Sequence, residues 1–411
     1  MSSQTSNSVQ SPSAPSLESK CTRRSFLEVG SLGALAGGLG TAGLNTAAAA
    51  SPTSLNGRPP RAGILIFNVG GPSHVDTFDV KPEAPVEIRG PFRPIATRAP
   101  GVQISELFPR HAEIADKFAL VRSCFHTGPA VHDAGWQLMQ TGRFFTAGLE
   151  TPHVGAVANS LLRQPSDLPY HVVLPDLMGR GGGNLAQAQS AGFLGETCRP
   201  FTQRDAGLES ASDSVRRAFD IASEPISVRD RYGRHPFGRS CLLARRLVEH
   251  GVGFVTINTF QTVFSGISWD THGRSPFSNF SDLQHRIAPM YDSAYTALIE
   301  DLDQRGLLPT TLVCNLCEFG RTPRINPHGG RDHWPQCYTV YFAGGGVRGG
   351  QVIGRSDSIG GSPEECPVDP PSIAATIFHG LGLDTRGSLV DPEGRRHPMV
   401  DNATPIPGLF G

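Results

Sequence analysis

The apolar residues of this 411-residue chain fall into short, separate runs, and the form of each run predicts an element of secondary structure. The run AGILIFNVGG, residues 62–71, is continuously apolar and ends in glycines, as a buried strand of a parallel sheet does. Similar runs predict strands at ALVRSCF (119–125), HVVLP (171–175), VGFVTIN (252–258), TLVCNL (311–316) and YTVYFAG (338–344).

Between these runs, apolar positions recur at helical spacing and predict helices. HDAGWQLMQTG, residues 132–142, ends at a glycine, which is a common stop signal for a helix. The other predicted helices are LFPRHAEIADKF (107–118), VGAVANSLL (154–162), RSCLLARRLVEHG (239–251), residues 287–305 and PPSIAATIFHGLGL (370–383). The alternation predicts an α/β fold, a three-layer sandwich with a mostly parallel central sheet. We expect residues 61–411 to form a single domain with a loop-rich insertion near residues 175–210.

The first fifty residues have a different character. Residues 1–20 are rich in Ser, Pro and Gln and are expected to be disordered. Arg23 and Arg24 then precede a mild Gly/Ala-rich apolar stretch, which ends in small residues suited to cleavage near Ala50. This pattern predicts a twin-arginine signal peptide within residues 1–50, followed by a linker at 51–60. The twin-arginine export machinery would then be a partner, and the mature chain would be periplasmic or secreted.

Composition narrows the class of protein further. With 36 basic and 37 acidic residues, the chain has no excess positive charge that would favour nucleic acid or a lipid surface. No run after the signal is long enough for a membrane span. Cys314 and Cys317 lie within an apolar strand, so we interpret them as core thiols. A disulfide among Cys198, Cys337 and Cys366 cannot be assigned from the sequence.

Four polar clusters follow strand-like runs, and ligands gather beyond the carboxyl ends of parallel strands. Carboxylates and imidazoles are ligands of divalent metals, and arginines are planar donors for phosphate or sulfate. The clusters are GGPSHVDTFD (70–79) with Ser73, His74, Asp76 and Asp79, SWDTHG (268–273) with Asp270 and His272, CEFGRTP (317–323) with Glu318 and Arg321, and HGGRDHW (328–334) with Arg331, Asp332 and His333. We therefore expect one shared site.

Each cluster also has a purely structural interpretation. Asp76 could cap a helix, Asp270 could form an Asx-turn beside a surface histidine, and Glu318 could pair with Arg321 in the interior. Separate structural roles explain the occurrence of all four clusters less well than one shared site does, because loops at strand ends often carry function.

Across residues 61–411 the chain resembles the alkaline phosphatase and sulfatase superfamily. It resembles more closely an exported bacterial branch classed as a family of unknown function. GGPSHVDTFD, EFGRTP, GRDHW and GGGVRGGQVIG (344–354) carry the likeness to that branch. In the wider superfamily, WDTHG matches a metal-binding Asp and His pair, Glu318 and Phe319 replace an Asp and a His, and His333 matches the last metal-binding histidine.

The chain departs from the superfamily at the nucleophile. Sulfatases carry a Cys or Ser nine residues ahead of a Thr-Gly pair, and counting back from Thr141 and Gly142 reaches His132. Trp136 occupies the position of the supporting arginine. Ser123 and Thr127 are outside candidates for a nucleophile.

Three routes remain open: attack by His132, attack by metal-activated water, or binding of a metal and an anion without hydrolysis. The resemblance implies a metal-dependent hydrolase of sulfate or phosphate esters, acting on a small anionic ester or a sulfated or phosphorylated glycan. We favour metal-activated water, with His132 as acid or base and Arg321 and Arg331 neutralising the anion. The ligands of the divalent metal (zinc, manganese or calcium) would be Asp270, His272, Asp332 and His333, with Asp76 and Glu318 as further candidates. The alternative is a non-catalytic, metal-containing binding or scaffold protein of the cell envelope.

Overall fold

The computed structural model describes residues 62–144, 148–179, 187–202, 205, 211–264 and 266–411. The predicted signal peptide and linker lie outside the described residues, and so does part of the predicted insertion.

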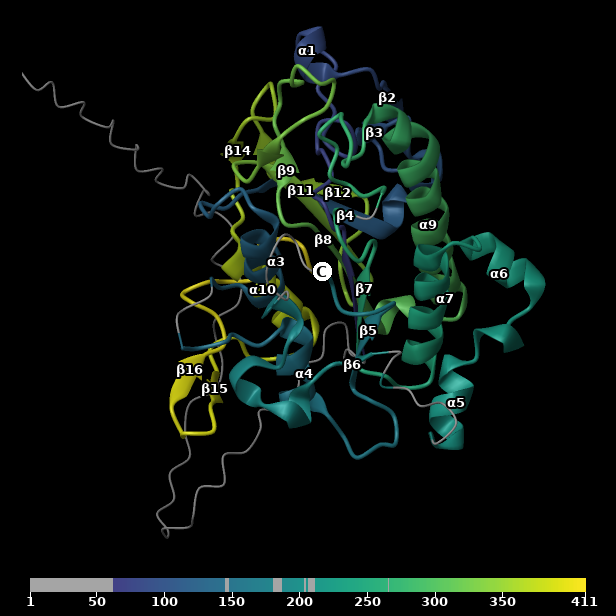
Figure 1. Cartoon of the computed structure of the whole chain (residues 1–411), viewed down its shortest axis with the longest axis vertical. Coiled ribbons are helices and arrows are strands. Elements are labelled where there is room, and N and C mark those ends of the chain that lie inside the picture. Colours follow the sequence, from purple (N-terminus) through teal and green to yellow (C-terminus); the bar gives the residue numbers. More distant parts are fainter. Residues whose placement is uncertain (1–61, 145–147, 180–186, 203–204, 206–210, 265) are drawn as a thin grey trace, which may run out of the picture. The chain divides into compact units, whose positions relative to one another are not determined.

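A sheet of eight strands forms the centre of the fold, in the order β12-β4-β11-β8-β1-β7-β5-β6 (Figure 1). The strands are β1 (Ala62–Phe67), β4 (Phe118–Cys124), β5 (His171–Leu174), β6 (Phe201–Thr202), β7 (Phe254–Asn258), β8 (Thr311–Leu316), β11 (Tyr338–Ala343) and β12 (Gln351–Ile353). Neighbouring strands are parallel, except that β11 runs antiparallel to both β4 and β8. The predicted α/β fold with a mostly parallel sheet is confirmed.

Helices cover both faces of this sheet and make the outer layers (Figure 1). Successive side chains of a strand point to opposite faces. Ile64 and Ile66 of β1 therefore pack into one hydrophobic cluster, and Leu65 and Phe67 pack into the other. The first cluster includes residues of α2 (Pro109–Glu113), α5 (Asp213–Phe219), α7 (Pro236–Glu249) and α9 (Ala288–Gln304), and the second includes residues of α3 (His132–Thr141), α4 (Val154–Leu162) and α10 (Pro370–Gly380).

The remaining elements are short and lie outside the central layers. Three short helices are α1 (Val86–Arg89), α6 (Ile226–Tyr232) and α8 (Phe280–Asp282). Four antiparallel pairs are β2 (Pro94–Ala96) with β3 (Gln103–Ser105), β9 (Gly320–Arg321) with β10 (His333–Trp334), β13 (Arg355–Ser356) with β14 (Pro363–Glu365), and β15 (Ser388–Val390) with β16 (Arg396–Pro398). No helix of the described part is long and apolar enough to cross a membrane.

One predicted helix, residues 107–118, is divided in the structure. It becomes α2 and a separate 3-10 turn, Ala115–Lys117. The backbone leaves helical geometry at Ile114 (φ −114°, ψ 16°), whose side chain is buried in the core. The carboxylate of Asp292 on α9 accepts the main-chain N–H groups of Arg110 and His111 at 3.0 and 2.9 Å. A tertiary contact from α9 therefore caps the first turn of α2.

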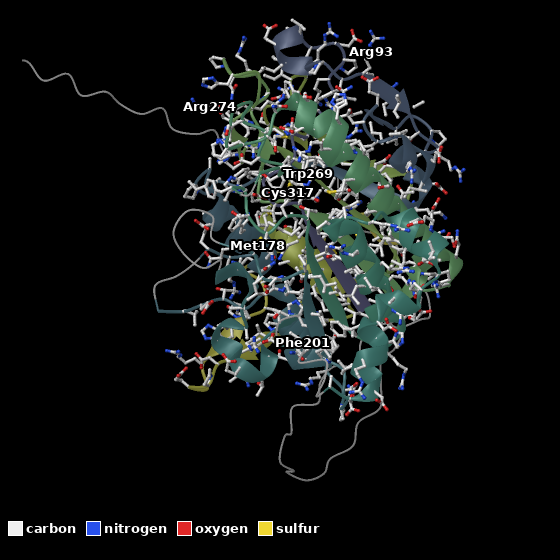
Figure 2. The ribbon with its side chains drawn as sticks, turned by 45° about the vertical axis from the view of Figure 1, so that its right-hand side comes forward. Arg93, Met178, Phe201, Trp269, Arg274 and Cys317 are labelled. Carbon is white, nitrogen blue, oxygen red and sulfur yellow. The ribbon has the colours of Figure 1, made fainter. Side chains whose placement is uncertain are left out.

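The interior of the described part holds large apolar groups and thiols. Figure 2 shows Trp269 and Cys317 inside the fold, whereas Arg93 and Arg274 lie at its edges. Cys314 is buried together with Cys317, so the prediction of core thiols is confirmed. Cys198 and Cys337 are free, buried thiols.

Candidate metal centre

The candidate site lies at the carboxyl ends of neighbouring parallel strands, as the alternating pattern predicted. Asp270 and His272 follow β7, Glu318 follows β8, and Gly70 follows β1. These three strands are adjacent in the sheet, so their following loops meet. The hairpin of β9 and β10 adds His333, which pairs with Arg321 in register.

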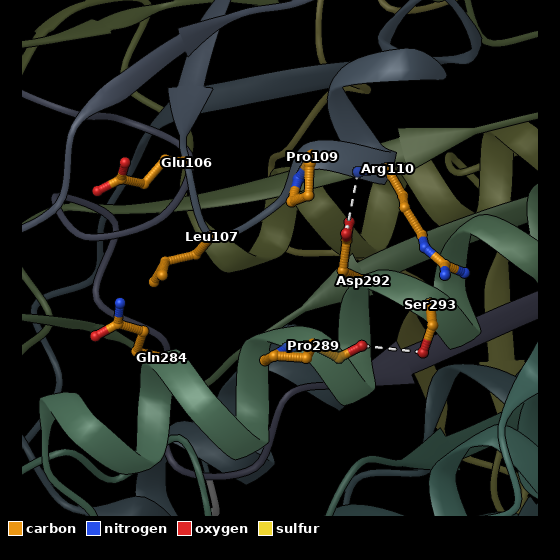
Figure 3. Close-up of a pocket in the computed structure, with 8 residues that line it drawn as sticks. All are labelled: Glu106, Leu107, Pro109, Arg110, Gln284, Pro289, Asp292 and Ser293. Atoms are coloured by element: carbon orange, nitrogen blue, oxygen red, sulfur yellow. Dashed lines mark hydrogen bonds between the residues drawn. The ribbon is translucent and has the colours of Figure 1, made fainter.

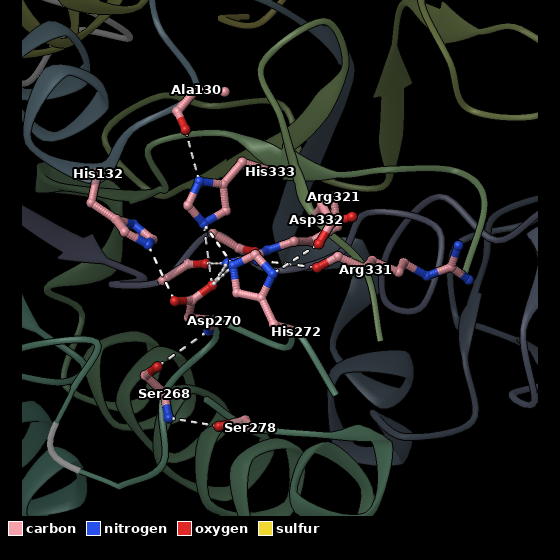
Figure 4. Close-up of polar contacts among 12 residues, drawn as sticks. Ala130, His132, Ser268, Asp270, His272, Ser278, Arg321, Arg331, Asp332 and His333 are labelled. Carbon is pink, nitrogen blue, oxygen red and sulfur yellow. Dashed lines mark hydrogen bonds and ion pairs between the residues drawn. The ribbon is translucent and has the colours of Figure 1, made fainter. Parts of the chain in front are cut away.

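Asp270 is the centre of the cluster and is fully buried (Figure 4). Its Oδ1 lies 3.0 Å from Nε2 of His272 and 3.3 Å from Nε2 of His333. The guanidinium of Arg321 donates to the same oxygen at 2.6 Å, and Oδ2 lies 3.3 Å from Nε2 of His132. Loops from four parts of the chain thus converge on one carboxylate.

The two histidines are oriented by contacts on their other nitrogens. Nδ1 of His272 lies 3.0 Å from Oδ1 of Asp332, whose side chain is 57% exposed. Nδ1 of His333 lies 2.8 Å from the carbonyl oxygen of Ala130, so the backbone turns its Nε2 toward Asp270. His272 therefore lies between two carboxylates. The exposed Asp332 contacts its Nδ1, and the buried Asp270 contacts its Nε2.

Glycines allow the loops to approach so closely. Gly70 has φ +113°, and a Cβ built there would stand 2.4 Å from the main-chain nitrogen of Asp270. A Cβ at Gly330 would stand 2.3 Å from the nitrogen of Gly273. Gly330 therefore lets the 328–334 segment pack on the loop that carries Asp270 and His272.

The electrostatics of the cluster follow from its burial and its charges. Burial would raise the pKa of Asp270, but Arg321 and the three histidines hold that pKa far below its usual range. Burial would lower the pKa of His132, yet its hydrogen bonds to Asp270 and Glu318 raise it above the ordinary value. Burial lowers the pKa of His333, only partly opposed by Asp270. These shifts favour the ionised form of Asp270 and the neutral form of His333.

The spacing of the ligand atoms fits a small divalent cation. Nε2 of His272, Nε2 of His333 and Oδ1 of Asp270 form a triangle with edges of 3.0, 3.0 and 3.3 Å. Tetrahedral ligands bound to zinc at about 2.0–2.1 Å stand about 3.3–3.4 Å apart, close to these edges. His132 adds a fourth nitrogen, since His132, Asp270 and His333 offer ligand atoms that all lie within 4.8 Å of one another. This donor set of imidazoles with one carboxylate suits zinc or manganese better than calcium, which prefers oxygen.

Asp76 and Arg331, two predicted site residues, are paired with each other away from the cluster. Arg331 donates to both carboxylate oxygens of Asp76, at 2.6 and 2.9 Å, and to the carbonyl oxygen of Ile88 at 2.7 Å. Both side chains are fully buried. Because the donors of Arg331 are occupied inside the protein, this guanidinium faces no substrate, and the structure does not bring Asp76 to the metal ligands.

Arg321 is also enclosed. Beyond Asp270, it donates to the carbonyl oxygens of Gly70, Gly71 and Arg331, and its side chain has no exposed surface. Its charge therefore compensates the buried Asp270, and its donors are not directed at a bound anion.

Other residues singled out in the sequence have structural contacts outside the cluster. Nε2 of His74 lies 2.7 Å from the carbonyl oxygen of Gly360, and the hydroxyl of Ser123 donates to the carbonyl oxygen of Cys366 at 2.5 Å. Thr127 and His328 are exposed. The indole of Trp334 donates to the carbonyl oxygen of Gly361 at 2.8 Å.

Trp136 and Gly70 contribute contacts to the site that the sequence did not assign to them. The indole N–H of Trp136 and the main-chain N–H of Gly70 both donate to Oε1 of Glu318, at 3.0 and 2.7 Å. Trp136 stands four residues after His132 on α3, so the two share one face of the helix. That spacing was readable in the sequence, whereas the contact of Gly70 depends on the fold.

A separate pocket of about 470 Å³ lies between residues 106–110 and the start of α9 (Figure 3). Its polar lining includes Glu106, Arg110 and Asp292, and it contains no residue of the cluster around Asp270.

Fold and cluster together define a three-layer α/β protein with a candidate metal centre at the strand ends. The model of the family described as "Protein of unknown function (DUF1501)" matches residues 61–211 and 202–410, and the chain belongs to this family. The predicted resemblance to a family of unknown function is thereby confirmed. Among curated proteins, none matches this sequence.

Several solved structures are remotely similar. One is a lipoteichoic acid synthase from Listeria monocytogenes, with 10% identity, a TM-score of 0.39 and coverage of 84% of this chain and 76% of that chain. A phosphonate monoester hydrolase from Silicibacter pomeroyi has 10% identity, a TM-score of 0.39 and coverage of 80% and 74%. An alkaline phosphatase from the Antarctic bacterium TAB5 has 13% identity, a TM-score of 0.39 and coverage of 79% and 99%.

Proposed function

We propose that this chain is an exported, metal-dependent hydrolase of sulfate or phosphate esters. The observation that carries the proposal is the triangle of ligand atoms from Asp270, His272 and His333, with edges of 3.0–3.3 Å. The proposal that the chain is exported rests on Arg23, Arg24 and the apolar stretch that follows them.

Asp270, His272 and His333 would hold the divalent cation. When bound, such a cation supplies Lewis acidity and lowers the pKa of water toward about 7. Arg321 keeps Asp270 ionised, so that the carboxylate is ready to bind a cation without releasing a proton. Asp332 orients His272 as a carboxylate behind a metal-binding histidine does. Nε2 of His132 would be a fourth ligand while it binds the cation, and it would transfer the proton during hydrolysis when it is released from the cation.

The second candidate is a metal-containing binding or scaffold protein of the cell envelope. The enclosure of Arg321 and Arg331 favours it, because neither guanidinium is free to neutralise a substrate anion. His132 at the expected position of the nucleophile favours it as well. This candidate predicts bound metal without turnover.

The experiment uses purified protein whose metal content is measured before and after dialysis against a chelator. Zinc, manganese and calcium are then added back, and hydrolysis is followed on aryl sulfates, aryl phosphates and sulfated or phosphorylated glycans. We expect zinc or manganese to be retained and one ester class to be turned over. Asp270→Asn should lose both metal binding and turnover. His328→Ala changes an exposed histidine in the segment that carries His333, and it should keep both. Absence of metal binding and of turnover with every cation would refute the proposal, and metal binding without turnover would select the second candidate.

A further inference from the structure

We infer that Glu318 is a positioning residue for His132: it holds the proton of the imidazole on Nδ1 and thereby presents Nε2 beside Asp270. The consequence for metal binding rests on the proposed function, whereas the hydrogen bond between the two side chains does not. In this arrangement Oε1 of Glu318 is engaged by His132, Gly70 and Trp136, which adds a positioning role to the ligand role predicted from the sequence.

Three nitrogens converge on a single oxygen of Glu318. Oε1 lies 2.7 Å from the main-chain nitrogen of Gly70, 3.0 Å from Nε1 of Trp136 and 2.7 Å from Nδ1 of His132. The first two nitrogens can only donate, so Oε1 must accept. Nδ1 of His132 could not also be an acceptor at that distance, because two lone pairs would then face each other. Nδ1 of His132 therefore carries a proton.

The second oxygen of Glu318 agrees with an ionised carboxylate. Oε2 is buried and has no hydrogen-bond partner among the described residues. A proton on Oε2 would have no acceptor there, whereas a charge shared with Oε1 is stabilised by three donors. Since Oε1 is fully used by those donors, a cation would contact Glu318 only through Oε2.

The helix that carries His132 is fixed against Glu318. Gly135 faces Glu318 so closely that a Cβ added to it would stand 2.7 Å from the Cβ of Glu318. The carbonyl oxygen of Glu318 lies 2.9 Å from Nε2 of His126. Packing thus fixes the backbone of both His132 and Glu318. The imidazole of His132 cannot rotate without breaking its hydrogen bond to Glu318.

The geometry leaves Nε2 of His132 as the atom directed at the centre. It lies 3.3 Å from Oδ2 of Asp270, and the rings of His132 and His333 lie 4.4 Å apart (Figure 4). A carboxylate that holds the far nitrogen of a histidine in this way fixes both its tautomer and its orientation. The specific prediction is that Glu318 governs metal affinity through its hydrogen bond to His132.

The first test measures which ring nitrogen of His132 carries a proton. The full chain is labelled with ¹⁵N-histidine, and nitrogen–proton correlations are recorded, with the signals of His132 assigned by their loss in His132→Asn. We expect Nδ1 to be protonated in the wild type. Glu318→Gln should keep this state, because its amide oxygen must occupy the Oε1 position to accept from Gly70 and Trp136. A bare Nδ1 in the wild type would overturn the inference.

The second test titrates zinc into Glu318→Ala, Glu318→Gln and the control Glu106→Gln, which changes a carboxylate in the separate pocket (Figure 3). Loss of such an outer partner lowers metal affinity by about 10–100-fold. We expect a loss of that size in Glu318→Ala, a smaller one in Glu318→Gln, and none in Glu106→Gln. If Glu318→Ala does not fold, the zinc affinity of Glu318→Gln and the protonation of Nδ1 in the wild type still test the positioning role of Glu318.

The outcomes separate this inference from the proposed function. Zinc binding that depends on His333 but not on Glu318 would overturn the positioning role and leave the metal centre intact. Protonation of Nδ1 that depends on Glu318, in a chain that binds no zinc, would support the positioning role and refute the metal centre.

Discussion

The Nε2 atoms of His272 and His333 lie 3.0 Å apart, although the two residues are separated by 61 positions in the chain. Two imidazole nitrogens approach this closely when one donates a proton to the other or when both bind one cation. Zinc titration distinguishes the two explanations.

Replacing either histidine by alanine should abolish tight metal binding. We expect His272→Ala and His333→Ala each to weaken zinc binding by more than the roughly 10–100-fold that loss of an outer partner costs. Calorimetric titration of apo-protein measures the effect. His328→Ala, an exposed histidine on the neighbouring loop, is the matched control and should bind zinc like the wild type. Equal affinity in all three variants would place the metal elsewhere.

Arg331 should matter for stability and not for metal affinity. Removing one partner of a buried ion pair leaves the other charge uncompensated, which costs about 3–5 kcal/mol. Arg331→Met should therefore lower the free energy of unfolding in urea by about that amount, because Asp76 stays buried. Arg324→Met, on the same loop and 70% exposed in its side chain, should change it little. A stable Arg331→Met variant that has lost turnover would restore the role in substrate binding suggested by the sequence.

Replacing Gly70 by alanine should destabilise the fold because the added methyl group would collide with the backbone of Asp270, in addition to straining its own backbone. Gly70 and Gly251 both have left-handed φ angles, +113° and +100°, where an alanine costs about 1–3 kcal/mol. Only at Gly70 would the added Cβ meet Asp270, whereas nothing lies within 4 Å at Gly251. Gly70→Ala should destabilise the chain more than Gly251→Ala does in thermal unfolding, and it alone should weaken metal binding. Equal behaviour of the two variants would contradict the close approach of the β1 loop to Asp270.

Acid should destabilise the fold through a pair of buried histidines remote from the cluster. Burial lowers the pKa of His153 to about 3, and burial together with His153 lowers the pKa of His171. The unfolded chain binds protons below its ordinary histidine pKa of about 6.5, whereas the folded chain does not. Stability is therefore greatest above about pH 6.5 and falls as the pH drops toward 3, by up to about 1.4 kcal/mol per pH unit for His153.

The variant His153→Asn isolates this effect. Asparagine can replace Nδ1 of His153 as the acceptor for the N–H of Gly155 at the start of α4, but it cannot bind a proton. Urea unfolding between pH 4.5 and 7.5 should show a weaker loss of stability with acid in this variant. The exposed control His285→Asn should keep the slope of the wild type. A wild-type slope in His153→Asn would show that His153 is protonated in the folded chain.

The order of elements was readable from the sequence because strands and helices leave local periodic signals. The run 311–316 coincides with β8, and the run 154–162 coincides with α4. The direction of β11 was not readable, because the same apolar run can pair in either direction. Its antiparallel pairing with β4 and β8 is set by the connections around it.

The sequence by itself determined which loops carry metal-binding groups, since Asp270, His272, Asp332 and His333 all follow strand-like runs. Only the tertiary structure decided how those groups are paired. Arg331 meets Asp76 across 255 positions, and Glu318 meets His132 across 186. Local patterns report the period and polarity of a segment, but they hold no information about which distant side chain it will face. A carboxylate that looks like a ligand in the sequence can therefore become the partner of an arginine or a histidine once packing brings one beside it.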